Sequence, residues 1–198
     1  MKSFIRTITV ILALTLMIAA IPTESEAKIY EDTIRLHILA NSDSDGDQEL
    51  KIKIRDKVLE KYGDMLSDYS DIEEAKSKTE KLLQLIKDDV DSWLSEMGAA
   101  YTSTVTLGDE WYETREYDGF TLPRGNYTSL RILIGEGEGQ NWWCVMFPPI
   151  CQGIAIGGAV GSGYTSEEEA LITSGKYSVK FKVLELISDA TRKVSKRG

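Results

Sequence analysis

A long amphipathic stripe over residues 70–97 most constrains what this chain can fold into. Ser70 and Glu73 have the spacing of an N-terminal capping box, and Gly98 is placed to end the helix. The apolar residues between them recur on one helical face: Ile72, Ala75, Leu82, Leu83, Ile86, Val90, Trp93, Leu94 and Met97. A helix of this length must bury that face, so we expect it to cover one side of a sheet.

A strand and another helix are expected before it. Residues 34–39 alternate, with Ile34, Leu36 and Ile38 on one face and Arg35 and His37 on the other, as in a buried strand. The acidic run "NSDSDGD", residues 41–47, ends the strand and offers helix caps. The apolar positions 50, 54, 58 and 62 then predict a first long helix.

Strand patterns dominate after Gly98. Residues 101–107, 110–117 and 127–135 are predicted strands, with turns at Gly108–Asp109 and Asp118–Gly119. Glycines crowd the stretch 135–165, which we expect to be irregular and mobile. A short helix is predicted at 166–173 with a cap at Ser166 and Glu169, and a C-terminal helix within 178–194.

These elements predict an α+β fold in a single domain, residues 28–198. Its sheet is mainly antiparallel, and two long N-terminal helices and a C-terminal helix pack on it.

The N-terminus has the features of a secretory signal peptide. Lys2 and Arg6 precede an uncharged apolar run, Ile8 to Ile21, and small residues lead to Ala27. The run is about 14 residues, shorter than the ~20 of a spanning helix. We expect residues 1–27 to be a signal peptide cut after Ala27, leaving no stable membrane span. The alternative is an uncleaved N-terminal anchor.

The formal net charge of −9 bears on possible partners. Nucleic-acid binding needs a basic face that neutralises phosphates, and anionic lipid attracts basic segments. The sequence therefore predicts no nucleic-acid partner and disfavours docking on anionic lipid.

The two cysteines, Cys144 and Cys151, allow two interpretations. In an exported chain they can form a disulfide around Pro148 and Pro149, which is the interpretation we favour. Alternatively, one thiol could pair with His37, the only histidine, in an extracytoplasmic hydrolase that uses Cys144 and His37. These three residues are too few for a typical structural zinc site, so no metal is expected there.

Other motif-like stretches are incomplete. "NSDSDGD" matches the first half of a calcium loop, but the twelfth position is Ile52 instead of a bidentate glutamate. The glycine run 153–163 lacks the lysine and hydroxyl residue of a phosphate-binding loop. The sequence therefore predicts no cofactor.

The stretch "NWWCVMF", residues 141–147, contains the remaining functional candidate. Trp142 and Trp143 are adjacent, so on an extended backbone they point in opposite directions. Tryptophan is a frequent interface anchor, and one of the two could be partly exposed near Met146 and Phe147. Two tryptophans that are both structural, one on each side of a layer, are the alternative.

Three stretches resemble the stage II sporulation protein R family of endospore-forming bacteria. They are "IRLHILANSDSDGDQELKIKIRDKVL", "TREYDGFTLPRGNYTSLRILIGEGEGQNWWCVMFPPIC" and "KFKVLELI". The resemblance covers roughly residues 33–187, with the exception of residues 152–176, which we interpret as a variable insertion.

The resemblance implies an intercellular signal and no enzymatic activity. Members are made in the forespore and exported into the space between forespore and mother cell. There they are needed to activate the membrane-embedded, aspartic-type protease that processes pro-sigma-E. The partner is therefore expected to be the extracytoplasmic part of that protease.

We expect the chain to act by binding, because activation requires tighter binding to the active state of the partner. The candidate contact residues are Asn141, Trp142, Trp143 and Phe147, with His37, Arg115 and Glu116 as polar neighbours.

Overall fold

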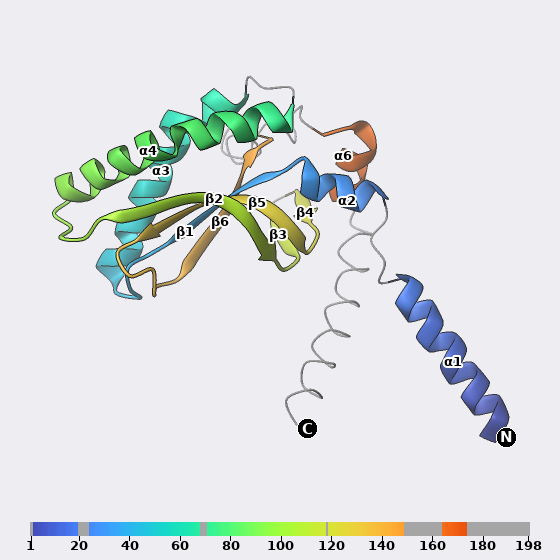
Figure 1. Ribbon diagram of the computed structural model, residues 1–198. Helices are drawn as coiled ribbons and strands as arrows, with labels where there is room; N and C mark the ends of the chain where they lie inside the picture. Colours follow the sequence, from blue (N-terminus) through green and yellow to red (C-terminus); the bar gives the residue numbers. More distant parts are fainter. Residues whose placement is uncertain (1, 20–23, 68–70, 118, 149–163, 174–198) are drawn as a thin grey trace.

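The computed structural model describes residues 2–19, 24–67, 71–117, 119–148 and 164–173 (Figure 1). The helices are α1 (Lys2–Ala19), α2 (Glu24–Glu31), α3 (Asp45–Ser67), α4 (Ile72–Glu96) and α6 (Ser166–Thr173). The strands are β1 (Ile34–Leu39), β2 (Ser103–Tyr112), β3 (Arg115–Tyr117), β4 (Phe120–Leu122), β5 (Gly125–Ile134) and β6 (Asn141–Phe147).

The main sheet has four strands in the order β2-β5-β1-β6. β1 lies between β5, to which it is parallel, and β6, to which it is antiparallel. β2 is antiparallel to β5, and β3 and β4 form a separate antiparallel hairpin. The predicted α+β fold with a mainly antiparallel sheet is confirmed.

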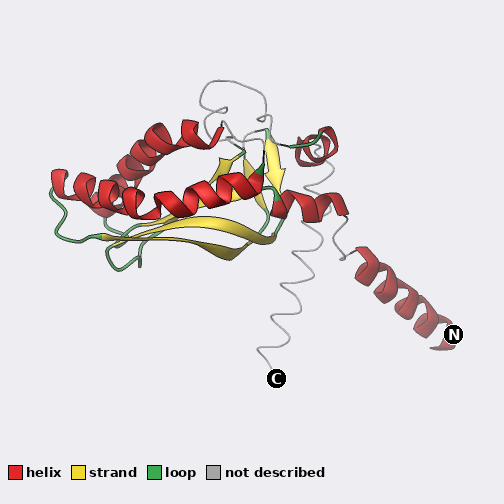
Figure 2. Ribbon diagram, turned by 45° about the horizontal axis from the view of Figure 1, so that its top comes forward, coloured by secondary structure: helices red, strands yellow, loops and turns green. Residues whose placement is uncertain are grey.

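Helices α3 and α4 cover one face of this sheet (Figure 2). Alternation places Leu36 and Ile38 of β1 on that face, where they meet Ile54 of α3 and Val90 of α4 in one buried cluster. The two long helices and their apolar stripes are therefore confirmed. The N-cap of α4 is Asp71, whose side chain accepts from the amide of Glu73, whereas the predicted cap Ser70 lies outside the described residues.

The loop from β1 to α3 is held by hydrogen bonds. The Asp47 carboxylate accepts hydrogen bonds from Asn41, Ser42 and Tyr101. The Ser44 hydroxyl accepts from the Asp47 amide at 3.2 Å, as a helix cap does. In this structure "NSDSDGD" is a capped helix start. Among the described residues, no group of three or more His, Cys, Asp or Glu side chains is placed to hold a metal ion.

Two predicted boundaries are wrong. Gly108 and Asp109 do not form a turn, because β2 passes through them in continuous register with Ser129 and Thr128 of β5. The stretch 135–165 is not irregular throughout, because residues 141–147 form the regular strand β6. Alternating aromatic and aliphatic side chains suit a strand there, and β1 supplies the hydrogen-bonding partner.

The preceding glycine loop is ordered as well. Gly135 and Gly137 have φ values of +59° and +66°, which only glycine adopts readily. The amides of Glu138 and Gly139 donate to the carbonyls of Asn41 and Ala40. This loop is thereby tied to the segment that connects β1 to α3.

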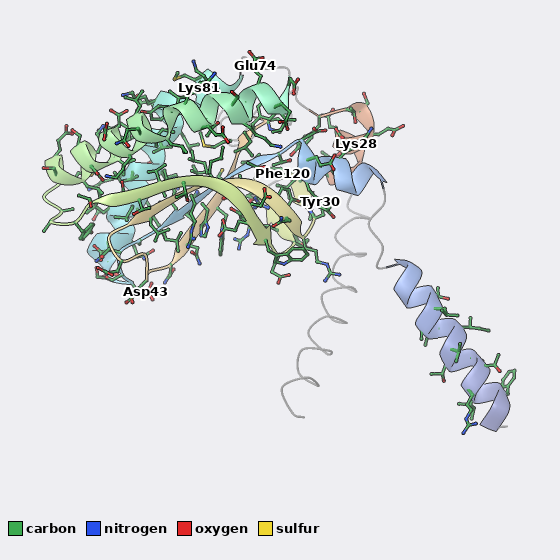
Figure 3. The ribbon with its side chains drawn as sticks, in the orientation of Figure 1. Lys28, Tyr30, Asp43, Glu74, Lys81 and Phe120 are labelled. Carbon is green, nitrogen blue, oxygen red and sulfur yellow. The ribbon has the colours of Figure 1, made fainter. Side chains whose placement is uncertain are left out.

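At one end, helices α2 and α6 pack on the second face of the sheet. Helices α2 and α6 contact each other there, next to β4 and β5 (Figure 1). Ile29 of α2, Ile172 of α6 and Phe120 of β4 share a buried cluster with Tyr127 of β5. In Figure 3, Tyr30 and Phe120 lie close together at this end, whereas Asp43 lies at the opposite end of the sheet.

The predicted helix at 166–173 is confirmed, but its cap is one residue earlier. The amide of Thr165 donates to Glu168 Oε2 and the amide of Glu168 donates to Thr165 Oγ1, which is the reciprocal capping box. The predicted C-terminal helix within 178–194 lies outside the described residues. Along the described ranges, no helix combines the length and the apolar character needed to cross a bilayer.

Candidate functional site

A polar cluster occupies the sheet face that α3 and α4 leave uncovered. The alternation that buries Leu36 and Ile38 under the helices turns Arg35 and His37 of β1 to this second face. His37 lies in register with Arg131 on β5 and with Trp143 on β6. Both β1 side chains are buried although they are polar, so each needs hydrogen-bonding partners.

His37 connects the two outer strands of the sheet. Its Nδ1 lies 2.9 Å from both carboxylate oxygens of Glu110 on β2, and its Nε2 lies 2.8 Å from Oδ1 of Asn141 on β6. A protonated imidazole can donate to both neighbours at once. The histidine is therefore held in a fixed orientation from both sides.

Glu110 is held in its ionised form by its surroundings. Partial burial disfavours the charge, but the hydrogen bond and electrostatic attraction from His37 and the hydrogen bonds with Tyr112 and Ser129 outweigh it. The pKa of Glu110 is therefore lowered from its ordinary value.

An aromatic and cationic stack stands next to this histidine. The rings of His37 and Trp143 are stacked with centroids 5.4 Å apart at 28°. The guanidinium carbon of Arg115, from β3, lies 3.9 Å from the centroid of the Trp143 ring. Arg115, Trp143 and His37 thus form one column, which we call the Trp143 stack.

Arg35 lies deeper on the same face, inside a cage of tyrosines. Its guanidinium carbon is 4.1 Å from the ring centroid of Tyr112, 5.0 Å from that of Tyr127 and 5.8 Å from that of Tyr117. Its Nη2 donates to the Tyr117 hydroxyl at 2.5 Å. No carboxylate pairs with Arg35 among the described residues, so aromatic faces are its main electrostatic partners.

The structure separates the predicted contact residues into two groups. His37, Asn141, Trp143 and Arg115 come together at the Trp143 stack, as expected. Glu116 follows Arg115 on β3 and is exposed, and its side chain alternates to the other side of that hairpin.

Trp142 and Phe147 do not lie at the Trp143 stack. Trp142 packs against the cluster beneath α3, where the guanidinium carbon of Arg55 lies 4.4 Å from the Trp142 ring centroid. Phe147 is buried with Ile34 and Ala75. Trp142 adjoins Trp143 on β6 and therefore points to the opposite face of the sheet. Phe147 lies beyond the bulge near Ile34, where the register of β6 against β1 shifts.

The proposed pairing of Cys144 with His37 is also wrong. Cys144 is paired with Leu36 in the sheet and shares its helix-covered cluster, whereas His37 lies on the opposite face. A thiolate there cannot reach the imidazole through the sheet. The disulfide of Cys144 with Cys151 stays a prediction, because Cys151 lies outside the described residues.

Several residues of this site are absent from the sequence prediction: Arg35, Glu110, Tyr112, Tyr117 and Ser129. The signal for Glu110 and Tyr112 was their alternation along β2. The predicted turn at Gly108 interrupted that alternation and hid it.

Comparisons with known proteins identify the family. The model of the family "Stage II sporulation protein R (spore_II_R)" matches residues 30–155. Stage II sporulation protein R of Bacillus subtilis (strain 168) is 40% identical over 123 residues, which is 62% of this chain and 55% of that protein. The chain thus matches little more than half the length of this relative. No solved structure matches significantly. The chain belongs to the stage II sporulation protein R family.

Proposed function

We propose that this protein is an exported sporulation signal that activates the membrane-embedded protease that processes pro-sigma-E. Membership of the family supports a role in sporulation. In this role the protein has a signal peptide cut after Ala27 and is released into the space between forespore and mother cell. It acts there by contact with the extracytoplasmic part of the protease and performs no chemistry of its own.

The Trp143 stack is the observation that carries this proposal. It combines a half-buried tryptophan with a cationic group and a histidine that both stack on its ring, on the sheet face without the long helices. Tryptophan and arginine are the residues that most often anchor protein interfaces. The stack is also pre-organised, because Glu110 and Asn141 fix His37 from both sides. A rigid anchor loses less conformational entropy on binding.

The test is to replace Trp143 and Arg115 by alanine, one at a time, in a sporulating strain whose own copy is deleted. We expect processing of pro-sigma-E to fall at least tenfold in both variants. Leu85→Ala is the matched control, since Leu85 is an exposed apolar residue of the helix layer, 46% accessible, far from the stack. Circular dichroism of the purified variants must show that they are folded.

Crosslinking tests the contact directly. A photoreactive residue at Glu116, which is exposed beside Arg115, should crosslink to the protease, whereas the same residue at Leu85 should not. The proposal is wrong if the folded Trp143→Ala and Arg115→Ala proteins support normal processing.

A further inference from the structure

A small cavity opens on the second face of the sheet, beside Glu110 and Arg131, which both neighbour His37 of the Trp143 stack. It measures about 140 Å³ and is lined by Thr106, Gly108, Asp109, Glu110, Ser129 and Arg131. Gly108 makes the cavity possible, because a Cβ built there would meet nothing within 4 Å. Sites for drug-sized ligands span ~300–1,000 Å³, so this one has room for a single short side chain.

One wall of the cavity carries a cation without a partner. Arg131 is only partly exposed, and its Nε is buried with no hydrogen-bond partner in the part of the chain that the structure describes. The guanidinium also forms no ion pair with any described carboxylate. A half-buried guanidinium has several donors to satisfy, so it favours a ligand with an acceptor oxygen.

The opposite wall carries negative charge. The surroundings of Glu110 lower its pKa, so it is ionised at neutral pH. The Ser129 hydroxyl lies 2.7 Å from the hydroxyl of Tyr112. A ligand that enters therefore meets donors on the Arg131 side and acceptors on the Glu110 side.

This two-signed lining discriminates between ligand classes. A carboxylate would be attracted by Arg131 but repelled by Glu110. A cation would be attracted by Glu110 but repelled by Arg131. A primary carboxamide is neutral and presents an acceptor oxygen and two N–H donors from one planar group. It satisfies both walls without a charge conflict.

We infer that the cavity at Gly108 is a binding site for a primary carboxamide, the side chain of an asparagine or glutamine supplied by a partner protein. This inference rests on the proposed function, in which the sheet face contacts the protease, and it specifies what the docking segment must contain.

The first experiment is an NMR titration of the full-length, ¹⁵N-labelled protein with N-acetyl-L-asparagine methylamide. We expect saturable shifts of the Gly108, Ser129 and Arg131 amide signals. N-acetyl-L-aspartate methylamide should bind at least fivefold more weakly, and N-acetyl-L-alanine methylamide should give no saturable shift at these residues.

A plugging variant supplies the specificity control. In Gly108→Val the new side chain fills the cavity, and the open space at this position lets the strand accommodate it. We expect binding of the asparagine probe to be lost. Thr104→Val is the matched variant, since Thr104 lies on the same strand and face but outside the cavity, and it should bind the probe like the unmodified protein.

The inference is overturned if the aspartate probe binds as tightly as the asparagine probe, if the alanine probe gives the same shifts, or if Gly108→Val leaves binding unchanged. Absence of any saturable shift would overturn it as well. The titration contains no protease, so its result is independent of whether the Trp143 stack contacts that partner.

Discussion

Trp142 and Trp143 are neighbours in sequence, yet they lie on opposite faces of the sheet. Each ring has an arginine over it: Arg55 of α3 over Trp142 and Arg115 of β3 over Trp143. Trp142 packs against the main core, and Trp143 stacks on His37. Substitutions at the two positions should therefore have different consequences.

Trp142→Ala should chiefly destabilise the fold. The ring is partly buried against the main cluster, so its loss should lower the free energy of unfolding by about 2–3 kcal/mol. Urea denaturation followed by circular dichroism measures this. Trp143→Ala is the comparison and should cost less stability, since its ring belongs to the smaller second-face cluster. Equal losses for the two variants would contradict the assignment of faces.

Arg35→Lys should be destabilising although it keeps the charge. Lysine cannot reproduce planar stacking against Tyr112 and Tyr127, so we expect a loss of about 2 kcal/mol. Arg55→Lys is the control, because that guanidinium stacks on a single ring near the surface, and it should change stability by no more than about 0.5 kcal/mol. Thermal unfolding of both variants decides the matter. A similar effect at the two positions would argue against the tyrosine cage.

Acid should remove a part of the stability that depends on Asp47. Hydrogen bonds from Ser42, Tyr101 and Asn41 lower its pKa from 3.8 to about 2. A lowered folded-state pKa means that the contribution is complete above the unfolded value, near pH 4, and is lost as the pH falls toward 2.

Asp47→Asn should therefore cost about 1 kcal/mol at pH 6, a modest figure because solvent reaches the carboxylate. It should cost little near pH 2. Urea midpoints at the two pH values test this, with the exposed Asp88→Asn as control. If Asp47→Asn lowered the stability equally at both pH values, the loss would not come from the charge of the carboxylate.

Gly139→Ala should destabilise the loop before β6. A Cβ at this position would lie 2.2 Å from the Ser42 carbonyl oxygen, which is backbone and cannot move aside cheaply. We expect a loss of about 1–3 kcal/mol in chemical denaturation. Gly108→Ala, where the added methyl group meets open space, should be neutral or stabilising by about 0.5 kcal/mol. If Gly108→Ala lowered the stability more than Gly139→Ala, the loop at Gly139 would not lie against Ser42.

Local periodicity was sufficient to predict the long helices and several strands of this fold. The stripes of α3 and α4 and the alternation of β1 depend only on neighbours in sequence, and they are confirmed. Alternation also placed Trp142 and Trp143 on opposite sides. It could not say which one meets the helices, because that depends on how β6 is registered against β1.

The polar cluster was harder to predict because it is built across strands. Glu110 reaches His37 from two strands away, over β5, and nothing in either local stretch indicates that meeting. Gly108 added an error, since a glycine followed by aspartate is typical of a turn and here lies inside a strand. The missed contact between Glu110 and His37 and the wrongly predicted turn at Gly108 both depend on how strands distant in sequence pair.

The central position of β1 has a consequence for the timing of folding. This strand comes early in the chain, but Ile34 pairs with Thr128 on one side and with Phe147 on the other. The sheet cannot close until both late strands are available, and closing such long loops is slow. Until then β1 has no strand partner among the described residues, so the main sheet should form only after most of the chain has been made.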